Sequence, residues 1–286
     1  MAETPSFSGH ETFHCRQFWL KKGYDFLKED RSFTAEDAVA HLGVGKNMVT
    51  AIRFWMRAFE MADENNKLSD LAKRLLDDKG WDPFLEDVGS LWLLHYHLVK
   101  AGYASIARIV FKDLRDRTPE FNAKTYTDFV LAEKGKVKES TLEKDFGVFL
   151  RNYHSREDGE IDDLSGLLAD LELVGVSKVE AEVDAKRKER KVYYIERKKR
   201  ASLPLPILLY AILDAFPEGL SFNLNTLMDP IGKTFALDKE GLYEMLSELK
   251  SIDKSITVSR EASVVELQFT KARPDRWTIL KNYYAR

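Results

Sequence analysis

The sequence lacks several features that would assign it to a class of protein. It contains a single cysteine, Cys15, so no disulfide can form within the chain. Even the longer apolar runs, such as Ile207–Leu213, fall far short of the ~20 residues that a helix needs to cross a bilayer. The first residues contain neither a basic cluster nor an apolar core, which is not the pattern of a signal peptide. We therefore expect a cytoplasmic protein with no membrane association.

An excess of positive charge is also missing. The 286 residues include 44 lysines and arginines against 47 aspartates and glutamates, which gives a formal net charge of −3. This balance argues against a general nucleic-acid coat protein, but contacts with phosphates need only local cations. Nucleic-acid binding would have to come from a patch, or be shared with a partner.

Motifs for nucleotide-dependent catalysis are absent as well. The sequence has no Rossmann glycine motif and no paired carboxylates in a recognisable catalytic frame. Gly43-Val44-Gly45-Lys46 is too short for a P-loop, which needs four residues between its glycines. The sequence therefore indicates no cofactor, and it favours a non-catalytic protein over an enzyme.

What the sequence does contain is a helix-turn-helix pattern over Phe33–Phe59. We expect a short first helix capped by Thr34, a turn through Gly43 and Gly45, and a longer second helix. The apolar stripe of the first helix is Ala35, Val39 and Leu42. The second helix has apolar residues at 4-3-4 spacing on one face: Met48, Ile52, Trp55 and Phe59. The alternative is a helical hairpin inside a larger core.

A polar face runs along the same second helix. It offers three cations and two hydrogen-bonding groups, as the recognition helix of a DNA-binding helix-turn-helix does. Arg53, near the middle, is the best candidate for a base edge, whereas Lys46 and Arg57 should contact phosphates. We expect duplex DNA to bind this face through Lys46, Asn47, Thr50, Arg53 and Arg57.

The segment His10-Glu11-Thr12-Phe13-His14 matches the HExxH pattern of zinc proteases, in which both histidines bind the metal from one helix face. Gly9 precedes it directly, no apolar helix leads into it, and no third ligand stands out. We therefore expect no metal, and a polar network formed by Gly9, His10, Glu11 and Arg16. The alternative is a metal- or thiol-dependent enzyme for sulfur transfer or hydrolysis, built on His10, Glu11, His14, Cys15 and Arg16.

Three separated motifs carry a family resemblance. They are FSGHETFHCRQFWLKKGYDF from Phe7, LGVGKNMVTAIRFWMRAF from Leu42 and DPFLEDVGSLWLLHYHL from Asp82. In this order they resemble the prokaryotic family of unknown function numbered 4007. The resemblance implies accessory proteins of antiphage loci, encoded beside sulfurtransferase-like genes of the DNA phosphorothioation type. It implies no established catalytic activity, and a position corresponding to His14 that is often not histidine.

The middle of the chain suggests a second, weaker helix-turn-helix. We expect a buried helix at Leu91–Val99, then a helix at Tyr126–Leu131, a turn at Lys134-Gly135, and a helix that starts with a capping box of Ser140 and Glu143. The apolar residues of this last helix are Leu142, Phe146, Phe149 and Tyr153. Its opposite face is nearly neutral, which predicts little or no DNA contact: Thr141, Lys144, Asp145, Val148 and Asn152.

A sharp change of charge follows. Arg156–Asp184 is acidic and includes a short apolar helix at Leu164–Leu173, whereas Lys186–Arg200 is strongly basic around a strand at Val192–Ile195. The basic residues are either a phosphate-contacting surface or a solvated strand neutralised by the acidic stretch. The candidate DNA contacts here are Lys186, Arg187, Lys198, Lys199 and Arg200.

The last part of the chain has the layout of a winged helix. We expect helices at Ile207–Phe216 and Asp238–Lys250, the second capped by Asp238, followed by two strands with alternating apolar residues. Its would-be recognition helix carries an acidic stripe, Glu240, Glu244 and Glu248, which repels phosphate. We therefore expect this unit to bind a protein partner.

These patterns predict a mainly α fold with small β wings, built from tandem helix-turn-helix and winged-helix units. The expected segments are 1–30, 31–118, 119–200 and 201–286. The expected function is that of a non-catalytic DNA-binding component of a prokaryotic antiphage defence or phosphorothioation-type DNA-modification system. Duplex DNA and a protein partner are the expected ligands, and the sequence is compatible with a homo-oligomer.

Overall fold

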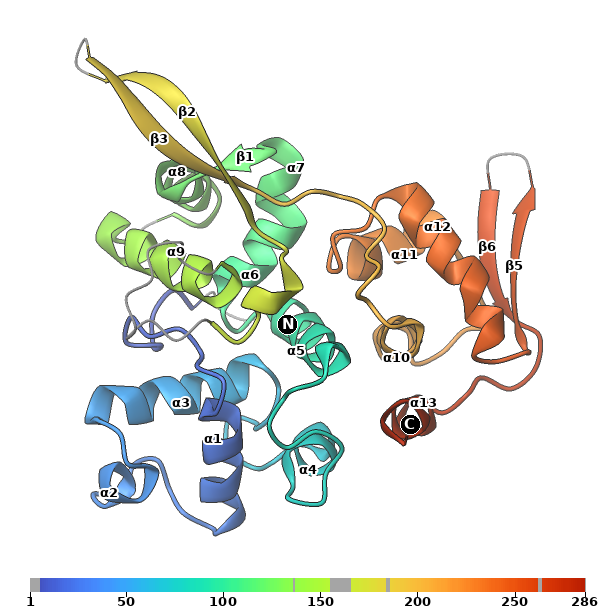
Figure 1. The fold of residues 1–286 in the computed structure, drawn as a ribbon, viewed down its shortest axis with the longest axis horizontal. Coiled ribbons are helices and arrows are strands. Elements are labelled where there is room, and N and C mark those ends of the chain that lie inside the picture. The colour runs from blue at the N-terminus through green and yellow to red at the C-terminus, as the bar shows by residue number, and fades with distance from the viewer. Residues whose placement is uncertain (1–5, 136, 155–165, 184–185, 262–263, 286) are drawn as a thin grey trace. The chain divides into compact units, whose positions relative to one another are not determined.

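The computed structural model describes residues 6–135, 137–154, 166–183, 186–261 and 264–285, with the backbone alone for 134, 180–183 and 186–189. These residues form two compact units (Figure 1). Unit 1 contains Met1–Phe84 and His97–Glu196, and unit 2 contains Leu85–Tyr96 and Arg197–Arg286. Helices dominate both units, and each has one three-stranded antiparallel sheet, as the sequence predicted for a mainly α fold with small β elements. No helix in the described ranges has the length and apolar character needed to cross a bilayer.

The first part of unit 1 is helical. Its elements are α1 (Trp19–Lys28), α2 (Ala38–Leu42), α3 (Lys46–Ala58) and α4 (Asp70–Leu76). In α3 the predicted apolar residues Ile52, Trp55 and Phe59 are buried, and Met48 is half-buried. Their 4-3-4 spacing therefore selected the face that packs into the core.

Helix α2 differs from its prediction. It begins at Ala38, its N-cap residue Asp37 makes no side-chain cap, and Thr34 lies in the preceding turn with its hydroxyl 2.8 Å from that of Ser32. Val39 is 41% exposed, and the buried residues are Ala38 and Leu42. The predicted stripe is confirmed at Leu42 but wrong at Ala35 and Val39, because the chain before Ala38 is a turn, which changes the positions that face inward.

The second part of unit 1 completes its core. After α5 (Val88–Ala101) the chain forms several short elements and two longer helices. They are α6 (Ser105–Arg108), the π-helix Ile109–Leu114, α7 (Arg115–Arg117), α8 (Ala123–Lys134) and α9 (Glu139–Tyr153). The α9 residues predicted to be apolar and inward, Leu142, Phe146, Phe149 and Tyr153, are all buried.

The opposite face of α9 was predicted to be a nearly neutral surface, and this is wrong for most of it. Asp145, Val148 and Asn152 are buried too, because the N-terminal segment of the chain packs against them. The predicted capping box is also absent, since Lys138 is the N-cap residue and makes no side-chain cap. The capping box belongs instead to α8, where Asn122 and Thr125 bond reciprocally.

The sheet of unit 1 has the order β1-β3-β2, with β1 at Glu120–Phe121, β2 at Gly175–Val183 and β3 at Lys186–Tyr194. Figure 1 shows β2 and β3 as a long hairpin. The predicted basic strand corresponds to β3, whereas β2 lies in the acidic stretch, for which no strand was predicted. The register places Glu182 opposite Arg187. The predicted helix at Leu164–Leu173 is wrong within the described residues, since only Ala169–Leu171 forms a short 3-10 helix.

Within the described residues, unit 2 consists of six helices of different kinds, a sheet of order β4-β6-β5 and the first part of α5. Its main elements are α10 (Leu205–Ala215), β4 (Ser221–Asn223), α11 (Leu224–Leu227), the π-helix Met228–Gly232, α12 (Lys239–Glu248), the 3-10 helix Leu249–Ser251, β5 (Ile256–Glu261), β6 (Val264–Phe269) and α13 (Arg276–Tyr284). Asp238 caps α12 by accepting from the Gly241 amide at 2.7 Å, as predicted.

Helix α5 contributes residues to both units. In unit 2 the Tyr96 hydroxyl donates to the Asp214 carboxylate at 2.9 Å, and the Tyr96 ring stacks on Phe235 at 5.9 Å. His95 Nε2 lies 2.7 Å from the carbonyl oxygen of Thr234. Residues 85–96 are therefore part of the C-terminal unit, although the expected segment began at 201.

The close packing of α1 on α3 generates a stability prediction. A Cβ added to Gly23 would lie 2.7 Å from Met56 Cγ and 2.8 Å from Met56 Sδ, inside the core. We expect Gly23→Ala to destabilise the protein by about 1–3 kcal/mol through overpacking, although alanine is the better helix former. The measurement is urea unfolding. Gly147→Ala in α9, where the added Cβ has only a contact at 3.9 Å, is the control and should stabilise. A stabilised Gly23→Ala protein would contradict the close packing.

Candidate nucleic-acid interface

The candidate DNA-reading face of α3 is exposed at one end and half-buried at the other. Lys46, Asn47 and Thr50 are exposed, and Arg53 and Arg57 are half-buried. The hydroxyl of Thr50 lies 3.4 Å from the carbonyl oxygen of Lys46 in the preceding turn of the same helix. The residues that can meet a ligand without rearrangement therefore lie in the first half of α3.

The N-terminal end of α3 is shaped for close approach. Gly43 ends α2 with φ of 63°, a left-handed conformation that favours glycine, and the extended Gly45 precedes α3 without a side-chain cap. A Cβ at either glycine would meet nothing within 4 Å. The first amides of a helix and its dipole attract anions. Lys46 adds a full positive charge at the same place, so this end of α3 can accept a phosphate.

The C-terminal end of α3 is held by the loop that follows it. Arg53 Nε donates to Asn66 Oδ1 at 3.1 Å, and an Nη of Arg57 donates to the carbonyl oxygen of Glu64. The bond from Arg53 uses Nε, and within the described residues its two terminal nitrogens have no hydrogen bond. A bidentate contact with guanine uses such terminal nitrogens. Arg57, by contrast, has a structural role as the support of this loop.

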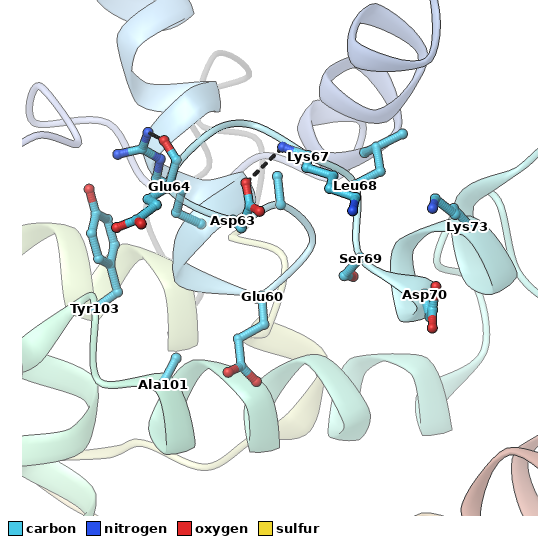
Figure 2. Close-up of a pocket in the computed structure, with 12 residues that line it drawn as sticks. Glu60, Asp63, Glu64, Lys67, Leu68, Ser69, Asp70, Lys73, Ala101 and Tyr103 are labelled. Carbon is cyan, nitrogen blue, oxygen red and sulfur yellow. Dashed lines mark hydrogen bonds between the residues drawn. The ribbon is translucent and has the colours of Figure 1, made fainter. Parts of the chain in front are cut away.

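A groove of about 750 Å³ lies beside this loop (Figure 2). Its charged lining residues are four acids and three bases: Glu60, Asp63, Glu64, Asp70, Arg57, Lys67 and Lys73. Asp63 accepts from the amides of Asn65 and Lys67 at 2.9 and 2.8 Å, which orders the loop. Because acids outnumber bases there, the groove disfavours a phosphate relative to the N-terminal end of α3.

Glu60, at the edge of the groove, is held by partners from α5. Its carboxylate lies 2.5 Å from His97 Nδ1 and 3.2 Å from Lys100 Nζ. Burial raises the pKa of Glu60, but the hydrogen bond from His97 and the charge of Lys100 outweigh burial and lower that pKa below its ordinary value. Glu60 is therefore an ionised anchor between the end of α3 and α5.

The predicted basic residues around β3 are divided between the two units. The side chains of Lys186 and Arg187 lie outside the described residues. Lys198 is exposed, Arg200 is only 7% exposed, and Lys199 Nζ lies 3.1 Å from Glu244 and 2.8 Å from Glu248. All three belong to unit 2, whereas α3 belongs to unit 1.

The HExxH segment is not helical, so the basis of the zinc-protease hypothesis is wrong. Residues 9–12 form a turn in which Glu11 and Thr12 have φ of 48° and 66°. His10 and His14 therefore do not follow each other on one helix face. Across the described residues, no three side chains of histidine, cysteine, aspartate or glutamate lie close enough together to hold a metal ion.

His10 instead joins a buried hydrogen-bond network. Its Nδ1 accepts from the Thr12 amide at 3.2 Å, which places the ring proton on Nε2, and Nε2 donates to Asp145 Oδ1 at 3.0 Å. Tyr126 donates its hydroxyl to Asp145 Oδ2 at 2.8 Å. Burial raises the pKa of Asp145 above its ordinary value, although the hydrogen bonds from His10 and Tyr126 act in the opposite direction.

The following residues attach the same segment to α3 and α9. Trp55 donates its indole N–H to the Phe13 carbonyl at 3.1 Å, and Arg151 donates to the Thr12 carbonyl at 2.7 Å. The Cys15 amide donates to Asn152 Oδ1 at 3.0 Å. Figure 1 shows the N-terminal segment between these two helices. Cys15 itself is 0% exposed, and burial raises the pKa of its thiol, which disfavours the nucleophilic thiolate.

The other residues of the predicted network have separate surroundings. Gly9 has φ of 103°, and a Cβ there would lie 3.0 Å from Phe54. Glu11 is exposed, and the guanidinium of Arg16 lies over the ring of Trp19 at 5.5 Å. The structure thus brings His10 together with Asp145 and Tyr126, not with Glu11 or Arg16. The sequence analysis placed Asp145 and Asn152 on one face of α9, but it missed that this face is buried and supplies partners to the N-terminal segment.

The buried network generates a prediction about stability and pH. Asp145→Asn leaves one of the two donors without an acceptor, so we expect a loss of about 1–3 kcal/mol near neutral pH. A raised folded-state pKa means that the contribution of Asp145 is full below its unfolded pKa and declines as pH rises through the folded pKa. The stability difference between the parent and Asp145→Asn should therefore shrink as pH rises above about 4.

The measurement is urea unfolding of both proteins across a pH series. Asp128→Asn is the matched control, because Asp128 is an exposed residue of α8 that pairs with Lys124. A difference that grows with pH would show that the folded protein favours the ionised carboxylate.

The geometry can be compared with known proteins. An SspB crystal structure superposes with a TM-score of 0.79 and 27% identity, covering 99% of this chain and 88% of that one. A magnesium ion-bound SspB crystal structure has the same TM-score and coverage, with 26% identity. No curated protein matches the sequence. A family model described as a protein of unknown function, DUF4007, matches residues 7–284 and confirms the resemblance seen in the three motifs, so the chain belongs to the DUF4007 family.

Proposed function

We propose that the protein is a non-catalytic DNA-binding component of a prokaryotic antiphage defence or phosphorothioation-type DNA-modification system. Duplex DNA binds at the N-terminal half of α3. The observation that carries this proposal is the combination of exposed Lys46, Asn47 and Thr50 with the uncapped start of the helix beside an open turn. Family membership and the similarity to SspB support the system-level part.

The arrangement suggests how the duplex is oriented. A phosphate at the start of α3 meets Lys46 and the first helix amides. Asn47 and Thr50 follow along the helix and can bond to phosphates or base edges. Arg53 lies one turn further, with its terminal nitrogens available for a base. The acidic loop beyond Arg57 repels the backbone, so the duplex is held at the first half of the helix.

A magnesium-dependent hydrolysis of DNA is the second candidate, favoured by one observation: a similar SspB structure contains a bound magnesium ion. The described residues bring no three metal-ligand side chains together, so no step is assigned to the ion here. Incubation of plasmid DNA with and without magnesium chloride, followed by gel electrophoresis, tests this candidate. A thiol-dependent reaction has no support, because Cys15 is buried.

The proposal includes a winged-helix role for unit 2, in which α10, α11 and α12 precede the β5–β6 hairpin. The acidic stripe of α12 supports a protein ligand over DNA. Its carboxylates have basic partners inside the unit, since Glu244 and Glu248 pair with Lys199, and Glu240 lies 3.6 Å from Arg260. These exposed pairs are worth little energetically, so a basic partner surface can replace them.

The DNA-binding surface is tested by substitutions that keep α3 folded. Lys46→Ala should weaken binding to all sequences and lower the salt dependence by about one unit of slope. Arg53→Ala should cost about 1–3 kcal/mol of binding and reduce any sequence preference. Gly45→Asp should cap α3 and keep or raise the melting temperature, yet weaken binding because its carboxylate repels phosphate.

The measurement is fluorescence anisotropy with a labelled duplex at two salt concentrations, with circular dichroism as the check on folding. Lys254→Ala, at an exposed lysine of unit 2, is the control. Arg57 is not substituted, because it supports the loop through Glu64. Parent-like binding by the folded Lys46→Ala, Arg53→Ala double variant would eliminate this surface.

The protein-binding surface is tested by reversing charge on α12. Glu244→Lys with Glu248→Lys places two positive charges beside Lys199 and removes two of the three carboxylates of the acidic stripe. We expect the variant to lose co-purification with the proteins encoded beside it while keeping its affinity for DNA. Lys250→Glu, an exposed charge reversal in the same unit, is the control. Retained co-purification together with loss of DNA binding would reverse the assignment of the two surfaces.

A further inference from the structure

A second basic surface lies in unit 1, where the N-terminal segment meets α9. It is a groove of about 590 Å³, called here the motif groove, and it is separate from the groove beside α3. The N-terminal segment contributes Phe13, His14 and Arg16, and α9 contributes Lys144, Gly147 and Arg151. The hydrogen bonds of His10 and Arg151 that attach the segment to α9 also fix the two walls of this groove.

The charges that line the motif groove are mainly positive. Arg16, Lys144 and Arg151 face a single acid, Glu143. Arg16 is oriented by its contact with Trp19, and Arg151 by its bond to the Thr12 carbonyl. Lys144 is exposed and makes no hydrogen bond or ion pair with the residues that the structure describes. A net-positive concave surface with oriented guanidinium groups favours phosphate ligands.

The spacing of the cations indicates a strand and not a single phosphate. The backbone positions of Lys144 and Arg151 are seven residues apart on one face of α9, which corresponds to about 10 Å along the helix axis. One strand of DNA rises about 3.4 Å per nucleotide, so this distance matches about three nucleotides. The half-buried ring of Phe13 adds an apolar wall of the kind that sugars and bases contact.

Gly147 leaves space in the groove between the two cations of α9. Glycine in the interior of a helix costs roughly 0.5–1 kcal/mol relative to alanine. Packing does not explain this cost, because an added Cβ would meet only an Nη of Arg151, at 3.9 Å. Because Gly147 has no side chain, the groove stays open at this position. A larger residue there would fill the space between Lys144 and Arg151.

We propose that the motif groove binds the phosphodiester backbone of a DNA strand, as a second contact of the protein with the nucleic acid that α3 reads. Lys144, Arg16 and Arg151 contact successive phosphates, and Phe13 lies against the sugar or base. This inference rests on the proposed function. It assigns a ligand to the segment that carries the family's first motif, which the α3 surface leaves without a role.

The test separates occlusion of the groove from damage to the fold. Gly147→Leu improves helix propensity and should keep or raise the melting temperature, whereas its side chain fills the groove. We expect this variant to bind a labelled oligonucleotide about tenfold more weakly than the parent. Lys144→Glu should weaken binding to a similar extent and lower the salt dependence by about one unit of slope. Lys138→Glu reverses the same charge just before α9, outside the groove, and is the matched control.

Fluorescence anisotropy is measured with a labelled single strand and with its duplex. Competition by inorganic phosphate then shows whether the groove binds a nucleic-acid strand or a single anion. Weaker binding by both groove variants, with the control unchanged, supports the proposal. Groove variants that bind like the parent, while Lys46→Ala and Arg53→Ala weaken binding, overturn this inference and leave the proposed function intact. If the groove variants bind DNA more weakly and the α3 variants bind it like the parent, the α3 surface is overturned and the assignment of the motif groove stands. Displacement by phosphate alone at matched ionic strength shows a single-anion site and overturns the strand assignment.

Discussion

A buried carboxylate needs donors on both oxygens, and Asp145 obtains them from parts of the chain that are far apart in sequence. Its partners are His10 in the N-terminal segment and Tyr126 in α8. Without them, burial of the carboxylate in the core would be strongly unfavourable. The network therefore holds the N-terminal segment against α9. This attachment places one wall of the motif groove, and it places the Phe13 carbonyl where it accepts the hydrogen bond of Trp55 in α3.

The sequence predicted those parts of the fold that depend on local patterns. The 4-3-4 spacing in α3 and α9 identified the inward residues, and Asp238 was correctly placed as a cap. These features succeed because helix periodicity and capping act within a few residues. Strand β2 was missed although Val179, Ala181 and Val183 alternate with charged residues, because the stretch was described only by its acidic charge. The pairing with β3 overrides that local preference.

The candidate site was less accessible to sequence reasoning. The face of α3 was identified by spacing, but nothing local shows that Arg57 supports a loop while Lys46 is exposed. The partners of the N-terminal motif were also hidden, because the contact between His10 and Asp145 spans 135 positions. Asn152 was assigned to the polar face of its helix, and nothing in the neighbouring residues shows that this face is buried by the N-terminal segment. Distant pairing is the information that a single sequence does not contain.

The division of α5 between the two units has a consequence for the synthesis of the chain. Trp92, Leu94 and Tyr96 are buried in unit 2, whose remaining residues begin at Arg197. A ribosome completes this helix long before it reaches the residues that cover it. During that interval the helix displays apolar side chains that lack their final partners, a situation that exposes a nascent chain to aggregation and to chaperones. Unit 2 can fold only after residues 197–286 emerge, so its folding follows the synthesis of the segment 97–196 that completes unit 1.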